Sequence, residues 1–345
     1  MNPFEPARLS PIPKTLVASP LPYDLTWADI RSSLPGFDDR ENANAQAFAS
    51  YEKQGLNGGP NSCILTLHYP IGENQFRSET VFIKQTIDTE KMEAQKYQIL
   101  AALGIPTPRL LAAIQKDNAE IILLEFLSKI GIDFRLTGEV KSLLYLVAQL
   151  NSIQNPPDVF NSSPVVPQGE FDERVRNALL EISHNPSLSV TVDVPRWFDA
   201  YQRARAACKS MPLAVNHNEF FFQQVGWAQR DDTSQLVIFD LETMCLSPRF
   251  NDIAGVLDRL ALYTGQDRLE LLRIYLDRMW ELNRLEMEID EALHEIRLVH
   301  LKGTFDSLPW HVDIARRPRL NETLDNPLLR SANSLQADLI ELGLL

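Results

Sequence analysis

Two stretches in the second half of the chain carry side chains that could do chemistry. NHNEFFFQQVGW, residues 216–227, holds a histidine, a carboxylate two residues later and a side-chain amide five residues beyond that. VIFDLE, residues 237–242, places Asp240 directly after an apolar run, where an acid is costly to bury without partners. A proton-accepting carboxylate, oxygen ligands for a metal ion and a cation for the phosphates are the groups that phosphoryl transfer requires. We take these two stretches as the candidate site.

A β-hairpin is predicted to position these side chains. FFFQQVGWAQ, residues 220–229, and SQLVIFDLE, residues 234–242, are short strand-like pieces separated by the turn QRDDTS. The hairpin lies between segments with helical spacing. The hairpin can hold one carboxylate from the loop before it and another from its second strand at the same phosphate-facing site.

The first part of the chain is rich in predicted strands. A turn-rich segment, GLNGGPNS, precedes them at residues 55–62. Apolar alternation and helical spacing then predict the order strand, strand, helix, strand, strand. The five segments are residues 62–70, 78–86, 89–104, 108–115 and 119–127.

The remainder of the chain is predicted to be mainly helical. Apolar residues at helical spacing predict helices over residues 141–154, 171–184, 195–209, 268–302 and 323–342. We therefore expect three parts, an α+β organisation with an initial arm. They are a proline-rich arm at 1–22, a β-rich N-terminal lobe at 23–127 and a helical C-terminal lobe at 128–345, which contains the hairpin.

Composition excludes several classes of protein. The 345 residues are 44% hydrophobic and 23% charged, with a formal net charge of -13. Such an acidic chain is a poor general binder of nucleic acid, whereas it tolerates cationic small molecules. The spacing of Cys63, Cys208 and Cys245 indicates neither a disulfide framework nor a zinc site. We expect a cytoplasmic protein without a membrane span, since no apolar run approaches the length of about 20 residues that a span requires.

The ordered motifs resemble the aminoglycoside phosphotransferase and choline kinase family of protein-kinase-like enzymes. That family has a catalytic loop with the pattern H-G-D-x-x-x-x-N, a metal-binding strand reading I-D-W/F-E, and a later D-L-A. Here HNEFFFQQ, IFDLE and NDIA stand in these three places, in the same order and at matching spacing. The resemblance implies a two-lobed kinase-like α+β fold that binds ATP and Mg2+ in the cleft between the lobes.

The resemblance assigns a role to each residue of the loop and the strand. Glu219 matches the catalytic aspartate, Gln224 the metal-binding asparagine and Asp240 the metal-binding aspartate. His217 and Asp252 match residues that brace the loop. Glu219 and Gln224 keep the expected functional groups but are each one methylene longer, which changes their reach by about 1.5 Å. Asn218 stands where the family has glycine.

The resemblance also assigns nucleotide contacts in the first lobe. Lys84 of VFIKQ falls where the family's phosphate-contacting lysine lies, and Glu93 falls where its ion-pair partner lies. Glu90 is the competing partner. The turn with Gly58 and Gly59 resembles the loop over the phosphates, and LLEFL, residues 123–127, resembles the hinge strand. The backbone from Glu125 to Leu127 would then hold adenine.

Two functions from different classes are consistent with the sequence. The first is an ATP-dependent phosphotransferase that acts on a hydroxyl of a small molecule, with Glu219 orienting that hydroxyl. The alternative is a catalytically silent pseudokinase that binds nucleotide or a protein partner. Lys84 and Asp240 favour the enzyme, and the longer Glu219 and Gln224 favour the silent form.

Two further features of the sequence keep two interpretations each. Glu242 is either a further metal ligand or a solvated acid. The phenylalanines at 220–222 are predicted to pack in a core, with a hydrophobic substrate wall as the alternative. The pattern predicts neither the acceptor nor the oligomeric state.

Overall fold

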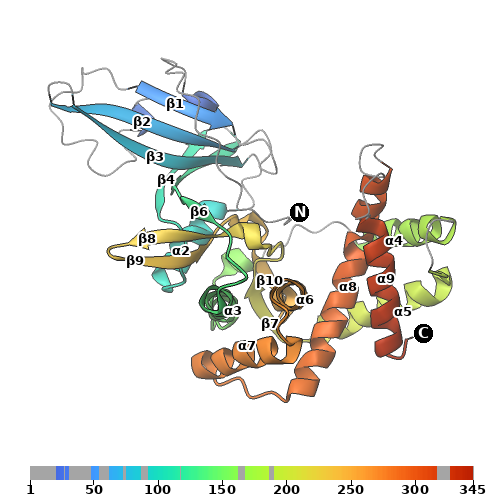
Figure 1. Cartoon of the computed structure of the whole chain (residues 1–345). Coiled ribbons are helices and arrows are strands. Elements are labelled where there is room, and N and C mark those ends of the chain that lie inside the picture. Colours follow the sequence, from blue (N-terminus) through green and yellow to red (C-terminus); the bar gives the residue numbers. More distant parts are fainter. Residues whose placement is uncertain are drawn as a thin grey trace. The chain divides into compact units, whose positions relative to one another are not determined.

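The chain forms two compact units in a computed structural model (Figure 1). The first unit joins Met1–Asp133 to Phe221–Glu242, and the second joins Phe134–Phe220 to Thr243–Leu345. The structure describes residues 21–26, 28–30, 48–53, 62–72, 75–86, 92–116, 118–161, 168–185, 190–316 and 327–344. Gly58, Gly59, Glu90 and the first twenty residues of the proline-rich arm lie outside this described part.

An antiparallel sheet forms most of the first unit. Its strand order is β1-β2-β3-β5-β4. Alternate apolar side chains of β2, β3 and β5 point to one face, as the period of two in a strand requires, and they share a core with Leu21, Leu25 and Ile30. The strands are β1 (Phe48–Lys53), β2 (Ser62–Gly72), β3 (Gln75–Thr86), β4 (Leu110–Lys116) and β5 (Ala119–Glu125).

The first unit also contains helix α2 (Glu93–Ala102) and a smaller sheet. This sheet has the order β6-β8-β9 and contains β6 (Lys129–Ile130), β8 (Val225–Arg230) and β9 (Thr233–Ile238). A Cβ added at Gly226 would lie 2.8 Å from Leu127 Cδ1 and 3.0 Å from Lys129 O. The missing side chain therefore lets β8 approach β6 and Leu127, two residues after the end of β5, closely.

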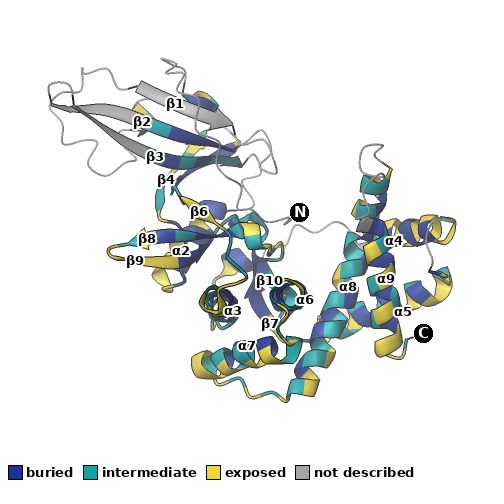
Figure 2. Cartoon of the chain, viewed as in Figure 1, coloured by how far each residue is buried: buried dark blue, intermediate teal, exposed yellow. Residues whose placement is uncertain are grey.

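The second unit is mainly helical, with the two-stranded sheet of β7 (Leu213–Asn216) and β10 (Cys245–Pro248). Helix α8 contacts α4, α5, α6 and α9, and it contributes Leu301, Phe305 and Leu308 to a buried core (Figure 2). The helices are α3 (Thr137–Asn151), α4 (Gln168–Ser183), α5 (Val194–Ser210), α6 (Asn251–Thr264), α7 (Arg268–Asn283), α8 (Ile289–Ala315) and α9 (Pro327–Glu341).

The expected α+β class is confirmed, and two predicted elements are corrected. The helical pattern over 268–302 forms two helices, because α7 ends where Arg284 adopts a left-handed conformation with φ 60°. The predicted strand over 220–229 begins only at Val225, since Phe222–Gln224 form a 3-10 turn. Across the described residues, no helix combines the length and the apolar character that crossing a bilayer requires.

Candidate active site

Lys84 is the centre of a cluster of charges in the first unit. Its Nζ lies 2.9 Å from Glu93 Oε2, 2.6 Å from Asp240 Oδ1 and 3.3 Å from Glu242 Oε2. Strand β3 supplies the lysine, α2 begins with Glu93, and the two other acids follow β9. The structure therefore brings Lys84 and Asp240 together across 156 residues of sequence.

Burial and the neighbouring opposite charges shift the pKa in opposite directions for both Lys84 and Glu93. Burial lowers the pKa of Lys84, but the charges of Glu93, Asp240 and Glu242 outweigh it and raise the pKa above its ordinary value. The ammonium is therefore protonated at neutral pH. Burial raises the pKa of Glu93, whose side chain is fully buried, while Lys84 opposes this rise. Because Glu93 has little access to water, its charge depends on Lys84.

Asp240 adopts a strained backbone conformation. Its φ is 66°, in the left-handed region that non-glycine residues seldom occupy. Glu93 contributes to holding this segment, because its Oε1 accepts a hydrogen bond from Leu241 N at 3.1 Å. Glu93 thus contacts both Lys84 and the backbone next to Asp240. The sequence predicted the first of these contacts but gave no signal for the second.

The predicted metal ligands have suitable chemistry, although Gln224 is already engaged. Mg2+ prefers oxygen ligands and is usually held by one or two carboxylates together with phosphates and water. Asp240 has a side chain that is 37% exposed, which leaves room for such ligands. The side-chain oxygen of Gln224 accepts from Phe221 N at 2.9 Å and caps the 3-10 turn, while its backbone O accepts from Phe239 N at 3.0 Å. The described residues contain no group of three or more His, Cys, Asp or Glu arranged to bind a metal alone.

The predicted hinge differs at its two ends. The backbone N–H of Glu125 donates a hydrogen bond to Arg109 O at 3.0 Å, and the Glu125 carboxylate accepts one from Arg230 Nη1 at 2.7 Å. Arg230 belongs to β8, so this ion pair ties the large sheet to the hairpin. Leu127 forms no backbone hydrogen bond within the described part of the chain and packs beside Ala228 and Val237. Of these two hinge residues, only Glu125 therefore has a backbone N–H engaged within the described residues.

The first part of the predicted catalytic loop, from His217 to Phe220, belongs to the second unit, where Asp252 braces it. The Asp252 carboxylate accepts from His217 N at 2.7 Å and from Asn218 N at 2.9 Å. Asp252 lies in the first turn of α6, and its own N–H donates to Asn216 Oδ1 at 3.2 Å. Thr243 Oγ1 donates to the carbonyl of His217 at 2.9 Å. The loop is thus held through its backbone as well as by its side chains.

Asn218 occupies the glycine position of the family pattern for a physical reason. Its φ is 69°, and asparagine tolerates this left-handed region better than most residues that carry a side chain. The side chain also fastens the loop, with hydrogen bonds that involve both its nitrogen and its oxygen. The partners are Asn216 O, Thr243 O, Cys245 Sγ, Ser247 Oγ and Asn251 Nδ2. Sequence reasoning treated Asn218 as a departure and did not find this role.

Glu219 is exposed, whereas His217 before it and Phe220 after it are buried. His217 is fully buried, and Phe220 is 7% exposed with its ring edge-on to the His217 ring at 5.7 Å. This pair fixes the chain on either side of Glu219, which is itself exposed. The expected core packing is found for Phe220, whereas Phe221 is 40% exposed.

Asp252 gives the loop a predicted pH dependence. Burial raises the pKa of Asp252 to about 7, and the two backbone N–H donors only partly oppose this rise. A raised folded pKa favours the protonated form, so this contribution to stability is complete below about pH 4 and is lost as the pH rises through about 7. The rise in the pKa of Asp252 corresponds to about 4 kcal/mol of unfolding free energy. We expect Asp252→Asn to reduce the fall in unfolding free energy between about pH 5 and about pH 8, measured by urea unfolding.

The exposed Asp199→Asn in α5 is the matched control and should retain the wild-type pH dependence. An Asp252→Asn variant with the same pH dependence as the wild type would contradict the assignment.

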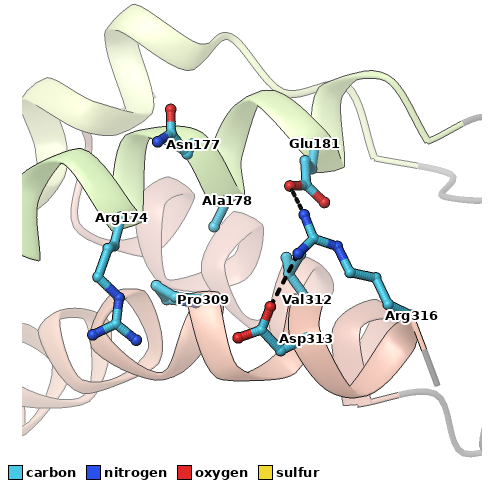
Figure 3. Close-up of a pocket in the computed structure, with 8 residues that line it drawn as sticks. All are labelled: Arg174, Asn177, Ala178, Glu181, Pro309, Val312, Asp313 and Arg316. Carbon is cyan, nitrogen blue, oxygen red and sulfur yellow. Dashed lines mark hydrogen bonds and ion pairs between the residues drawn. The ribbon is translucent and has the colours of Figure 1, made fainter.

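A separate groove lies between α4 and α8 (Figure 3). Ala178 lines it, and Arg316 pairs there with Glu181 and, at 3.1 Å, with Asp313. The full lining is Arg174, Asn177, Ala178, Glu181, Pro309, Val312, Asp313 and Arg316. None of the residues predicted from the sequence lines this groove, so the candidate site remains the Lys84 cluster and the Glu219 loop.

A family profile places the chain among known proteins. The APH profile, described as the phosphotransferase enzyme family, matches residues 84–289, which is more than half of the chain. This range contains the Lys84 cluster and the loop. No curated protein matches the chain.

Solved structures share the fold at low sequence identity. A choline kinase from Cryptosporidium parvum has a TM-score of 0.54 at 13% identity, covering 92% of this chain and 96% of its own. An aminoglycoside phosphotransferase from Alicyclobacillus acidocaldarius has a TM-score of 0.51 at 14% identity, covering 95% of each chain. An AMP-bound spectinomycin phosphotransferase has a TM-score of 0.51 at 14% identity, covering 78% of this chain and 90% of its own. These likenesses confirm the kinase-like α+β fold, and the profile match shows that the chain belongs to the phosphotransferase enzyme family.

Proposed function

We propose that the chain transfers the γ-phosphoryl group of ATP to a hydroxyl of a small molecule. The observation that carries this proposal is the meeting of Lys84, Glu93 and Asp240 from three separated segments. A fixed cation beside an exposed carboxylate is the arrangement that phosphates and a metal ion require. The AMP in a spectinomycin phosphotransferase of the same fold supports an adenine nucleotide as the donor.

Each residue has a distinct role in the proposal. Lys84 binds the phosphates of ATP, and Glu93 holds Lys84 in place. Asp240, with the side-chain oxygen of Gln224, would hold Mg2+, which when bound neutralises charge on the phosphates. Leu127 offers backbone groups to adenine. Gly58 and Gly59, which precede β2 in the sequence, would cover the phosphates.

Glu219 would orient the acceptor hydroxyl and accept its proton. Carboxylates do this work when they lie within hydrogen-bond reach of the hydroxyl. The exposure of Glu219 and the bracing of its loop by Asp252 support the role. The acceptor is a small molecule with a hydroxyl, and the net charge of -13 favours a cationic one.

One observation favours a catalytically silent pseudokinase as the second candidate. The side-chain oxygen of Gln224 is bonded to Phe221 N, so it must share or leave this contact to bind a metal ion. A silent protein would bind nucleotide through Lys84 without turnover.

Thermal unfolding with and without Mg-ATP tests nucleotide binding. At a nucleotide concentration of about 100 Kd, binding adds about 2.7 kcal/mol to stability, which corresponds to several degrees in Tm. We expect Asp240→Asn to lose the part of this shift that depends on Mg2+, because the variant lacks the charged ligand. Asparagine suits the φ of 66° at this position better than alanine.

The exposed Asp232→Asn in the turn of the same hairpin is the control and should keep the full shift. A wild type without any shift would refute the proposed function. A shift without ATP consumption, over a panel of amino alcohols, sugars and aminoglycosides, would instead support the silent protein.

A further inference from the structure

Helix α2 presents a buried lysine to the backbone that follows Asp240. Lys96 is 1% exposed, and its Nζ donates to Leu241 O at 3.2 Å and to Glu242 O at 2.9 Å. Lysine is among the residues least often fully buried, because its ammonium is strongly hydrated. The mechanism proposed above gives this residue no role.

Two neighbours on α2 contact the same segment. Tyr97 is also 1% exposed, and its hydroxyl accepts from Asp240 N at 3.0 Å. Glu93 accepts from Leu241 N at 3.1 Å. Positions 93, 96 and 97 lie on one face of a helix, since residues three and four apart are neighbours. One face of α2 therefore binds N–H groups and carbonyls of residues 240–242.

These contacts explain how Asp240 keeps an unfavourable conformation. A non-glycine residue in the left-handed region persists only where its surroundings hold it. An ammonium buried against two carbonyls supplies such a restraint, although removing it from water is unfavourable before the hydrogen bonds are counted. An apolar side chain could fill the same volume without this cost. We therefore attribute the presence of the Lys96 ammonium to the restraint that it places on the carbonyls of Leu241 and Glu242.

We propose that Lys96 and Tyr97 are positioning residues that set the Asp240 carboxylate for Mg2+. This inference rests on the proposed function, in which Asp240 is the metal ligand. Lys96 fixes the carbonyls after Asp240, and Tyr97 fixes the N–H of Asp240 itself. Lys84 binds the phosphates in the proposed function, and Glu93 holds both Lys84 and the N–H of Leu241, whereas Lys96 and Tyr97 act only on the segment of the metal ligand.

Binding of ADP with Mg2+ and with EDTA tests the proposal in the full chain. Replacing a partner that orients a metal ligand typically costs about 10- to 100-fold in metal affinity. We expect Lys96→Met to weaken ADP binding by about this factor in Mg2+, and to leave binding in EDTA unchanged. Tyr97→Phe should act in the same direction, and Lys96→Arg should restore part of the Mg2+ effect. Gln98→Met, on the exposed face of α2, is the control and should match the wild type in both conditions.

The possible outcomes separate this inference from the proposed function. Wild-type protein that binds no ADP in either condition overturns both. Lys96→Met with the wild-type dependence on Mg2+, or with equal losses in Mg2+ and EDTA, overturns the positioning role alone. If Lys96→Met does not fold, Tyr97→Phe decides by the same comparison.

Discussion

Replacing Lys84 with methionine is expected to lower turnover by about 100- to 1,000-fold, the usual cost of losing one fixed donor to developing charge. The same change should reduce the free energy of unfolding by about 3 to 5 kcal/mol, because it leaves a buried charge without its partner. Glu93 is that charge, with a fully buried side chain 2.9 Å from Lys84. Urea unfolding and an ATP-consumption assay measure the two effects separately.

A second substitution distinguishes stability from chemistry. In Lys84→Met with Glu93→Gln, no fully buried carboxylate remains in the Lys84 cluster, and the introduced glutamine keeps an oxygen that can accept from Leu241 N. We expect this double variant to recover most of the lost stability and none of the lost turnover. Recovery of turnover together with stability would show that Lys84 only holds the fold.

The pH dependence of the single variant provides a further check. Burial already raises the pKa of Glu93, and without Lys84 this rise is no longer opposed. The folded protein then favours protonated Glu93, so the loss of stability in Lys84→Met should shrink as the pH falls and grow as it rises. Lys302→Met is the control, because Lys302 forms a partly exposed pair with Asp306 on α8. Such pairs contribute about 1 kcal/mol or less.

The fold was predictable where a local pattern matches the element that forms. Alternating apolar residues such as Cys63 and Leu65, or Val81 and Ile83, predicted strands whose buried face the structure confirms. The break between α7 and α8 had no such signal. Helices commonly end at glycine, but here the left-handed position is Arg284, an ordinary residue for a helix interior.

The candidate site was predictable for those residues that the order of the family motifs identifies. The resemblance assigned Lys84 and Asp240 to one nucleotide and metal site, and the structure places their side chains 2.6 Å apart. The side-chain direction of Gln224 was not predictable, because a local cap and a metal ion compete for the same oxygen. Lys96 was missed for a different reason. Lysine side chains on helices usually extend into solvent, and only the structure shows that Lys96 is buried.

Replacing Glu219 with glutamine is expected to lower turnover by about 100- to 10,000-fold, the range that a positioned base contributes. Stability should change by no more than about 0.5 kcal/mol, because the side chain is exposed and its loop is fastened through Asn218 and Asp252. ADP binding should be unchanged. Glu270→Gln, at an exposed position of α7, is the matched control for turnover.

Glu219→Asp then decides between the two candidate functions, because it restores the residue that the family pattern has at this position. If the loop is built around the longer glutamate, the shorter side chain withdraws the carboxylate by about 1.5 Å and turnover should fall. A displacement of about 1 Å can cost about 100-fold in rate. If the wild type is instead silent because its carboxylate and amide reach too far, Glu219→Asp with Gln224→Asn should gain turnover. An active wild type with turnover unchanged in Glu219→Gln would show that Glu219 is not the base, since the amide cannot accept the proton.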